Sequence, residues 1–339
     1  MTSKETVLAA LEELQIPETP YKLKQLRLIT DVTVSDATVN VSLSRGALPP
    51  EILKQLGSSV REELVRHAGF SRININAVEN KPGELNRVKN IVAVMSGKGG
   101  VGKSTLSSLL AVSLQRLGYS VGILDADITG PSIPKLFGLS GKPLGNEKGI
   151  VPLSTDTSIR IMSINLVLNN DSDSVIWRGP LISKAISQFW EDVLWGELDY
   201  LIVDLPPGTS DAALTAMQQI PLTAVLMVTT PQALAGLIVR KAMDMTRKMN
   251  IPVLGLAENM AFFPDPRTGE AIEIFGRSQA KEILGEFNLP LIARLPVDPN
   301  LAVLCDAGKI EQYKSDVINN LGRAVVERLT ELKAKEKEQ

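Results

Sequence analysis

One short stretch constrains the fold of this chain more than any other: residues 95–105, which read MSGKGGVGKST. Residues 97–104 match the pattern G-x-x-x-x-G-K-[ST], directly after an apolar run at residues 91–95 and before a helical stretch at residues 105–117. The glycines let backbone N–H groups turn inward around phosphate oxygens, and the N-terminus of the helix adds partial positive charge. The stretch therefore predicts a phosphate-binding loop that joins a strand to a helix.

Each residue of this loop is a predicted nucleotide contact: Gly97, Lys98, Gly99, Gly100, Val101, Gly102, Lys103, Ser104 and Thr105. In such a loop the lysine that precedes the hydroxyl residue contacts the β- and γ-phosphates, which predicts this role for Lys103. The Ser104 hydroxyl is then expected to ligate Mg²⁺. ATP and Mg²⁺ are therefore the expected cofactors.

Aspartates follow two further apolar runs. Asp125 and Asp127 come after the run at residues 120–124, and Asp204 closes the run at residues 200–203. Carboxylates at strand ends of a parallel sheet can reach a metal–phosphate centre. We expect Asp204 to hold the Mg²⁺ hydration shell in the manner of a Walker B aspartate. Asp125 is expected to support the same metal shell, and Asp127 to orient the attacking water.

Lys98 is a second lysine inside the loop, where an ordinary loop of this kind needs only one. A solvated surface lysine is one interpretation, because exposed lysines are common. The other is a cation that reaches the phosphate of a facing subunit, since Lys103 already serves its own chain. Lys98 would then be the lysine equivalent of an arginine finger. With Lys103, Asp127 and Asp204 it completes the predicted catalytic set of a Mg²⁺-dependent ATPase that works as a homodimer.

The apolar runs also indicate the fold class. They lie at residues 91–95, 120–124, 200–203, 224–228 and 253–256 and alternate with helical stretches. Several lack polar alternation, as in strands that are buried on both faces of a parallel sheet. The pattern predicts an α/β fold, a doubly wound and mostly parallel sheet, for residues 86–339.

The first part of the chain follows a different pattern. Residues 1–85 predict a small α+β domain with a helix at residues 7–14, a hairpin at residues 32–43, a second helix near residues 50–67 and a strand at residues 72–78. The polar stretch NKPG at residues 80–83 interrupts every pattern and predicts the linker between the two domains.

Composition excludes several classes of protein. Cys305 is the single cysteine and His67 the single histidine, which excludes a disulfide within the chain and limits histidine-based catalysis. The formal net charge of −2 indicates no basic face for nucleic acid. No apolar run is long enough to span a bilayer, and the first residues lack the apolar core of a signal peptide. We therefore expect a cytoplasmic protein whose partners include neither nucleic acid nor membrane.

The loop and several later strings resemble a known family. KGGVGKST at residues 98–105 is similar to the deviant Walker A loop of the MinD/ParA/nitrogenase-iron-protein class of dimeric ATPases. Four strings narrow this resemblance to the Mrp/ApbC family of iron–sulfur cluster carrier ATPases: DADITGPSIP at 125–134, WRGP at 177–180, WGELDYLIVDLPPGT at 195–209 and ENM at 258–260. The first 85 residues more weakly resemble the small iron–sulfur assembly domain that is often fused to such ATPases.

The resemblance implies a homodimer that sandwiches two ATP molecules and serves iron–sulfur cluster assembly, with iron–sulfur apoproteins or scaffold proteins as partners. It also implies that Asn259 contacts the adenine and that Asp298 lies near the base. The family usually carries a Cys-x-x-Cys pair after the ENM string, but residues 261–270 contain no cysteine. Four thiolates are the usual ligands of a four-iron cluster. The sequence therefore identifies no iron–sulfur ligand, and an iron–sulfur cluster as cofactor is implied by the resemblance alone.

Two hypotheses for the function of this chain are compared. The first is an ATP-hydrolysing dimeric switch of iron–sulfur cluster assembly or transfer to apoproteins. The alternative is a MinD/ParA-like positioning or regulatory ATPase without an iron–sulfur role. Residues 325–339 alternate both charge signs and end without apolar residues, unlike a basic and apolar membrane-targeting helix. We therefore expect the first function.

Overall fold

The computed structural model describes residues 3–35, 38–68, 70, 72–127, 130–167 and 179–338. Its contacts divide the chain into two compact units. The first consists of Met1–Val88, Lys142–Ser154 and Gln188–Leu198, and the second of Lys89–Gly141, Thr155–Ser187 and Asp199–Gln339. Two short segments of the later chain thus complete the first unit.

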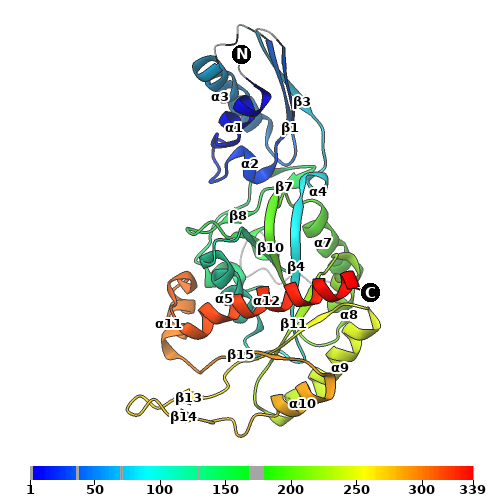
Figure 1. Cartoon of the computed structure of the whole chain (residues 1–339), viewed down its shortest axis with the longest axis vertical. Helices are drawn as coiled ribbons and strands as arrows, with labels where there is room; N and C mark the ends of the chain where they lie inside the picture. Colours follow the sequence, from blue (N-terminus) through cyan, green and yellow to red (C-terminus); the bar gives the residue numbers. More distant parts are fainter. Residues whose placement is uncertain are drawn as a thin grey trace. The chain divides into compact units, whose positions relative to one another are not determined.

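A three-stranded sheet forms the centre of the first unit (Figure 1). The predicted hairpin is confirmed, because β1 (Ile29–Ser35) pairs antiparallel with β2 (Thr38–Ser44). The predicted third strand, β3 (Arg72–Val78), pairs parallel with β2. The remaining elements are α1 (Lys4–Glu12), α2 (Leu23–Leu26), α3 (Pro50–Ala68), α4 (Pro82–Leu85), β6 (Gly145–Asn146), β7 (Gly149–Ile150) and β8 (Leu153–Ser154).

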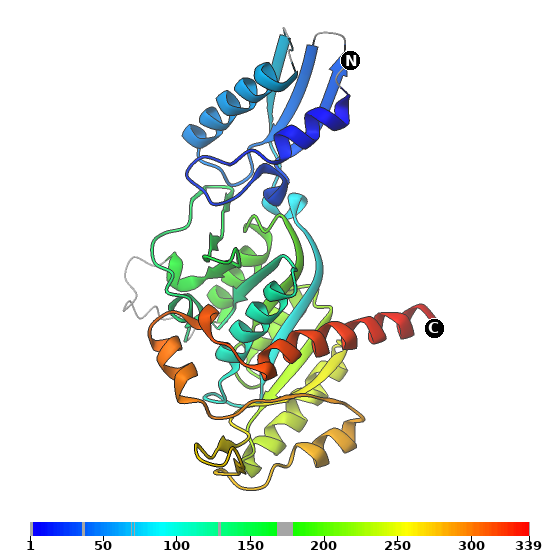
Figure 2. The same ribbon diagram turned by 60° about the vertical axis from the view of Figure 1, so that its left-hand side comes forward.

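The core of this unit lies between the sheet and the long helices. Figure 2 shows α1 and α3 along the sheet, where they also contact each other. Leu11 of α1, Val41 of β2 and Leu56 of α3 are fully buried in one cluster. Val151 and Leu194, from the two later segments, belong to the same cluster. Burial of apolar surface therefore holds these segments to the small domain.

The second unit is built on the predicted parallel sheet, which is confirmed. Its strands run in the order β15-β12-β11-β4-β10-β5-β9, and the registered pairs of these strands are parallel. The strands are β4 (Arg87–Ser96), β5 (Val121–Asp125), β9 (Arg160–Ser163), β10 (Glu197–Asp204), β11 (Ala224–Thr229), β12 (Val253–Glu258) and β15 (Leu291–Arg294). Two of them, β9 and β15, were not predicted from the sequence. Both are only four residues long and lie outside the five apolar runs.

Helices accompany this sheet. They are α5 (Lys103–Arg116), α6 (Ile133–Leu136), η1 (Ile164–Leu166), α7 (Gly179–Glu191), α8 (Asp211–Gln219), α9 (Ala233–Lys248), α10 (Ala280–Phe287), α11 (Pro299–Asp306), η2 (Ile310–Gln312) and α12 (Asp316–Glu338). The long helix α12 packs beside α5 (Figure 1). A small hairpin of β13 (Phe263–Pro264) and β14 (Ala271–Ile272) leaves the sheet region. No helix in the described ranges is both long and apolar enough to cross a membrane.

The strand order brings the predicted loop and strand-end aspartates together at the carboxyl ends of neighbouring strands. β10 lies between β4 and β5, so the loop that follows Ser96 and the carboxylates that end β5 and β10 lie at the same end of the sheet. Asp204 of β10 is in direct register with Asp125 of β5. In parallel sheets, ligands bind at the carboxyl ends of the strands.

Candidate functional site

The loop between β4 and α5 depends on glycine at two positions. Gly100 and Gly102 have φ values of 79° and 81°, in the left-handed region that residues with a Cβ adopt at a cost. A Cβ at Gly102 would lie 2.1 Å from Nδ2 of Asn259. That amide donates a hydrogen bond of 2.8 Å to the Val101 carbonyl. Asn259 thus holds the loop from the end of β12.

A buried charge cluster lies at the start of α5. The Lys103 ammonium is 2.8 Å from Oδ2 of Asp204 and 3.6 Å from Oδ2 of Asp127. The Ser104 hydroxyl donates to the same Oδ2 of Asp204 at 2.5 Å. Both Lys103 and Asp204 are buried. The structure therefore brings together four residues that the sequence placed at the phosphates, at the metal and at the attacking water.

Asp125 lies behind this cluster and is fully buried. Its carboxylate accepts hydrogen bonds from the Ser163 hydroxyl at 3.0 Å and from the backbone N–H of Asp127 at 3.3 Å. Burial, and after it the charge of Asp204, raise the pKa of Asp125 to about 7. Burial in the nucleotide-free protein therefore favours the protonated form of Asp125.

Lys98 points to a side chain of its own chain. Its ammonium donates to Oε1 of Gln232 at 2.7 Å; Gln232 is exposed and Lys98 is partly buried. The backbone around it is held by the neighbouring strand ends. The Ser96 hydroxyl donates to the Lys98 carbonyl at 3.0 Å, and the N–H of Gly208 donates to the Ser96 carbonyl at 2.8 Å. Lys98 is thus presented at the surface beside the loop.

A cavity of about 290 Å³ opens above the loop. Its lining residues are Ser96, Lys98, Gly99, Gly100, Gly102, Lys103, Ser104, Thr105, Asp127, Gly130, Ser132 and Pro207. This lining is polar, with two lysines and the start of a helix, which is the chemistry that binds phosphate. No group of three or more His, Cys, Asp or Glu residues in the described ranges could hold a metal ion. A hydroxyl and a single carboxylate suit Mg²⁺, which keeps several waters and binds through substrate phosphates.

Two residues implied by the resemblance lie away from this lining. Asn259 contacts the loop from behind through Val101, as described above. Asp298 caps α11, accepts from the backbone N–H of Asn300 at 2.9 Å, and accepts from the Tyr313 hydroxyl at 2.8 Å. Neither is among the described residues that line the loop cavity. Their contacts with a base stay predictions.

Cys305 lies on α11 and is partly buried. Burial raises the pKa of its thiol, which disfavours the thiolate that binds metal. The segment that follows Asn259 forms the β13–β14 hairpin, with exposed Ile272, Ile274 and Phe275. Trp177 and Arg178 of the WRGP string lie outside the described residues.

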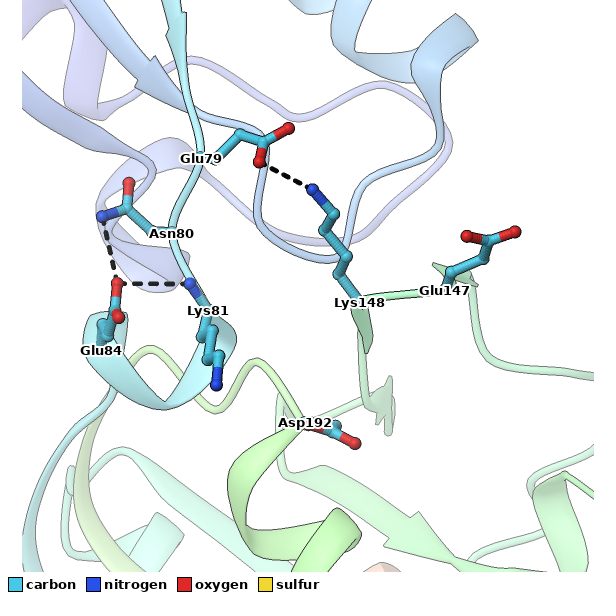
Figure 3. A pocket seen from close by; sticks show the side chains of 7 residues that line it. All are labelled: Glu79, Asn80, Lys81, Glu84, Glu147, Lys148 and Asp192. Carbon is cyan, nitrogen blue, oxygen red and sulfur yellow. Dashed lines mark hydrogen bonds and ion pairs between the residues drawn. The ribbon is translucent and has the colours of Figure 1, made fainter.

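A second cavity, of about 450 Å³, lies in the first unit (Figure 3). Three of its charged side chains, Glu79, Glu84 and Lys148, already have partners. Lys148 pairs with Glu79 at 2.8 Å, and Glu84 accepts from the side chain of Asn80 at 3.4 Å and from the backbone N–H of Lys81 at 3.3 Å. These pairs favour a solvated polar surface over a catalytic site.

The structure adds residues that the sequence did not single out: Ser107, Ser163 and Gln232. Ser107 could have been found, because it lies one turn after Ser104 on the same face of a predicted helix. Ser163 and Gln232 are brought to the site by β9 and by the start of α9, and no local pattern marks them.

The two parts of the chain match two different protein families. Residues 87–330 match the family described as NUBPL iron-transfer P-loop NTPases, and residues 4–76 match a family described as iron-sulfur cluster assembly proteins. The iron-sulfur cluster carrier protein of Clostridium perfringens is 42% identical over 237 residues, which are 68% of this chain and 83% of that protein.

A cytosolic Fe-S cluster assembly factor Nubp2 homolog of Drosophila grimshawi is 42% identical over 258 residues, which are 74% of this chain and 98% of that protein. Among solved structures, a nucleotide-binding protein from Archaeoglobus fulgidus in complex with ADP is 44% identical with a TM-score of 0.61. The match covers 68% of this chain and 90% of that one.

Proposed function

This chain belongs to the family of NUBPL iron-transfer P-loop NTPases, and from that premise we propose that it is a Mg²⁺-dependent ATPase that acts as a homodimeric switch in iron–sulfur cluster assembly or transfer. The observation that carries the proposal is the Lys103–Asp204–Ser104 cluster at the foot of the loop cavity. Its three side chains are those that a P-loop site uses for phosphate and for the hydrated metal ion.

The residues of the site divide the work of hydrolysis. The loop N–H groups and Lys103 would hold the β- and γ-phosphates, and Ser104 and Asp204 would hold Mg²⁺ and its waters, with Asp125 behind them. When bound, Mg²⁺ neutralises charge on the phosphates. Asp127 lines the loop cavity, where it orients the attacking water. In the nucleotide-free protein Lys103 instead neutralises the carboxylates, so phosphate has to draw it away from Asp204.

Lys98 makes ATP hydrolysis depend on dimerisation. It is partly exposed in the lining of the cavity and donates to a neutral partner, Gln232, which it can exchange for a phosphate of the facing subunit. A cation delivered in trans stabilises charge that develops on the transferred phosphoryl group. Hydrolysis then occurs only when two chains meet.

The iron–sulfur cluster is the cargo of this switch. Relatives of the chain are named cluster carrier and cluster assembly proteins, which supports apoproteins or scaffold proteins as partners. Cys305 is the single thiol, so a dimer offers two thiolates where a four-iron cluster usually takes four. The partner therefore supplies most of the cluster ligands.

The domain division and the location are part of the same proposal. Residues 1–85 form the iron–sulfur assembly domain and residues 86–339 the ATPase domain, of which residues 142–154 and 188–198 pack within the first unit; the match of residues 4–76 to cluster assembly proteins supports this division. The name of the Drosophila relative supports a cytoplasmic location.

The test measures ATP-dependent repair of an iron–sulfur apoprotein. A scaffold protein loaded with a cluster is mixed anaerobically with an apo four-iron protein and this chain, and recovery of the client is followed with ATP or ADP. Lys103→Ala is expected to lose ATP binding by calorimetry and the ATP-dependent recovery together. Lys248→Ala, a change of an exposed lysine on α9 that pairs with Asp244, serves as the matched control. Recovery that is equal with ATP, with ADP and with Lys103→Ala would refute the proposed function.

A further inference from the structure

The Asp204 carboxylate has one more partner than the expected site chemistry uses. Within the part of the chain that the structure describes, three side chains contact it. Lys103 and Ser104 both approach Oδ2, whereas the Ser107 hydroxyl donates to Oδ1 at 2.6 Å. Asp204 and Ser107 are both fully buried, so water does not satisfy this carboxylate.

Nucleotide binding removes two of these three contacts. Under the proposed function, Lys103 moves to the β- and γ-phosphates and the Ser104 hydroxyl turns to the metal ion. Oδ2 of Asp204 then faces the waters of the metal. Ser107 is the one side chain of the three that has no task at the nucleotide, so its bond to Oδ1 remains.

Ser107 also has a second acceptor, which makes its choice of partner informative. A serine in a helix often donates to the carbonyl four residues earlier, and the Ser107 hydroxyl lies 3.1 Å from the carbonyl of Lys103. Its distance to Oδ1 of Asp204 is shorter, at 2.6 Å. A hydroxyl has one hydrogen to donate, and a bond to a carboxylate is the stronger one. The proton therefore goes to Asp204.

We propose that Ser107 is a positioning residue that keeps the Asp204 carboxylate aimed at the metal ion after Lys103 and Ser104 have turned to the nucleotide. The inference rests on the proposed function. Without Ser107, the Asp204 carboxylate rotates toward another donor, because a buried carboxylate oxygen without a donor is costly. The affinity for Mg²⁺ then falls, while the affinity for metal-free nucleotide does not.

The neighbouring serine provides a matched control. Ser108 is as fully buried as Ser107, and its hydroxyl donates to the carbonyl of Ser104, four residues earlier, at 2.9 Å. It makes no contact with Asp204 among the described interactions. Ser107→Ala and Ser108→Ala thus each remove one fully buried hydroxyl from neighbouring positions of α5, and only the first removes a bond to the carboxylate.

The experiment follows binding rather than hydrolysis. The full chain binds a fluorescent N-methylanthraniloyl-ATP first in EDTA, and Mg²⁺ is then titrated into the complex. The wild type and both variants are expected to bind metal-free nucleotide within about twofold of one another. Ser107→Ala is expected to need roughly tenfold more Mg²⁺ for half-saturation, the loss typical of a hydrogen bond to a charged group. Ser108→Ala is expected to match the wild type.

Each other outcome overturns the inference in a recognisable way. Equal Mg²⁺ titrations for Ser107→Ala and the wild type show that Ser107 only supports the helix, and equal shifts in both variants show a general effect of buried hydroxyls. If Ser107→Ala does not fold, Ser107→Thr keeps a hydroxyl, and a titration unlike that of the wild type overturns the inference. A wild type whose nucleotide binding does not respond to Mg²⁺ refutes the proposed function itself.

Discussion

Replacing the loop glycines by alanine separates backbone strain from steric conflict at the nucleotide site. Gly99, Gly100 and Gly102 lie in one loop, and their Cβ environments differ. A Cβ at Gly99 or Gly100 meets no atom within 4 Å, whereas one at Gly102 lies 2.1 Å from Nδ2 of Asn259. Gly100 and Gly102 have positive φ values, and Gly99 has not. Alanine at Gly99 therefore adds neither effect, alanine at Gly100 adds backbone strain, and alanine at Gly102 adds both backbone strain and a steric conflict.

The expected losses of unfolding free energy follow from these differences. Gly99→Ala is expected to be close to neutral. Gly100→Ala costs about 1–2 kcal/mol, because it forces a residue with a Cβ into the left-handed region. Gly102→Ala also displaces Asn259 and so breaks the hydrogen bond between its amide and the Val101 carbonyl. The loss of this buried bond adds a further cost of about 1–3 kcal/mol, the usual magnitude for unsatisfied buried polar groups. The total for Gly102→Ala is therefore about 2–5 kcal/mol.

The assay is urea denaturation of the nucleotide-free protein together with ATP calorimetry. Gly102→Ala is also expected to weaken ATP binding at least roughly tenfold, since the distorted loop turns its N–H groups away from the phosphates. Combining it with Asn259→Ala removes the conflict, so the double variant should lose about 1–3 kcal/mol less than the sum of the single losses. Equal stability of the Gly100 and Gly102 variants, or additive losses in the double variant, would refute the reasoning.

Four further outcomes are expected. Because the pKa of Asp125 is raised to about 7 by burial and by Asp204, the folded protein binds more protons than the unfolded chain between about pH 4 and pH 7. The unfolding free energy of the nucleotide-free protein therefore falls as the pH rises through this window, by at most about 1.4 kcal/mol per pH unit. Asp125→Asn is expected to flatten this dependence of stability on pH, measured by thermal melts, and an unchanged dependence contradicts the expectation. Lys98→Ala keeps ATP affinity but lowers steady-state turnover by roughly a hundredfold or more, and unchanged turnover rules out its role in trans. Gln232→Ala frees Lys98 from an exposed hydrogen bond, so half-maximal ATPase activity is reached at about two- to threefold lower protein concentration, and an identical concentration dependence argues against this restraint. Anaerobic reconstitution with iron and sulfide gives little stoichiometric cluster, and an intense charge-transfer absorbance that Cys305→Ala abolishes would show the opposite.

The elements of the fold that could be predicted are those with local signals. The hairpin of β1 and β2 shows alternation of apolar and polar residues, and the five apolar runs become the central strands. The strands β9 and β15 escaped prediction because their sequences, RIMS and LIAR, each contain a charged arginine and form no continuous apolar run. The membership of residues 142–154 and 188–198 in the first unit has no local signal at all, because apolar contacts such as those of Val151 and Leu194 decide it.

The site divides in the same way. By itself the sequence determined the loop, its two lysines and the strand-end aspartates, because spacing along a strand–loop–helix unit dictates where backbone N–H groups and carboxylates lie. Only the tertiary structure decided the partners of these residues. It brought Ser107 to Asp204, Asn259 to Val101 and Gln232 to Lys98, from positions about a hundred residues or more apart in the chain. Such contacts depend on the order and register of strands in the sheet, which is set by burial across the whole domain and not by any local stretch of residues.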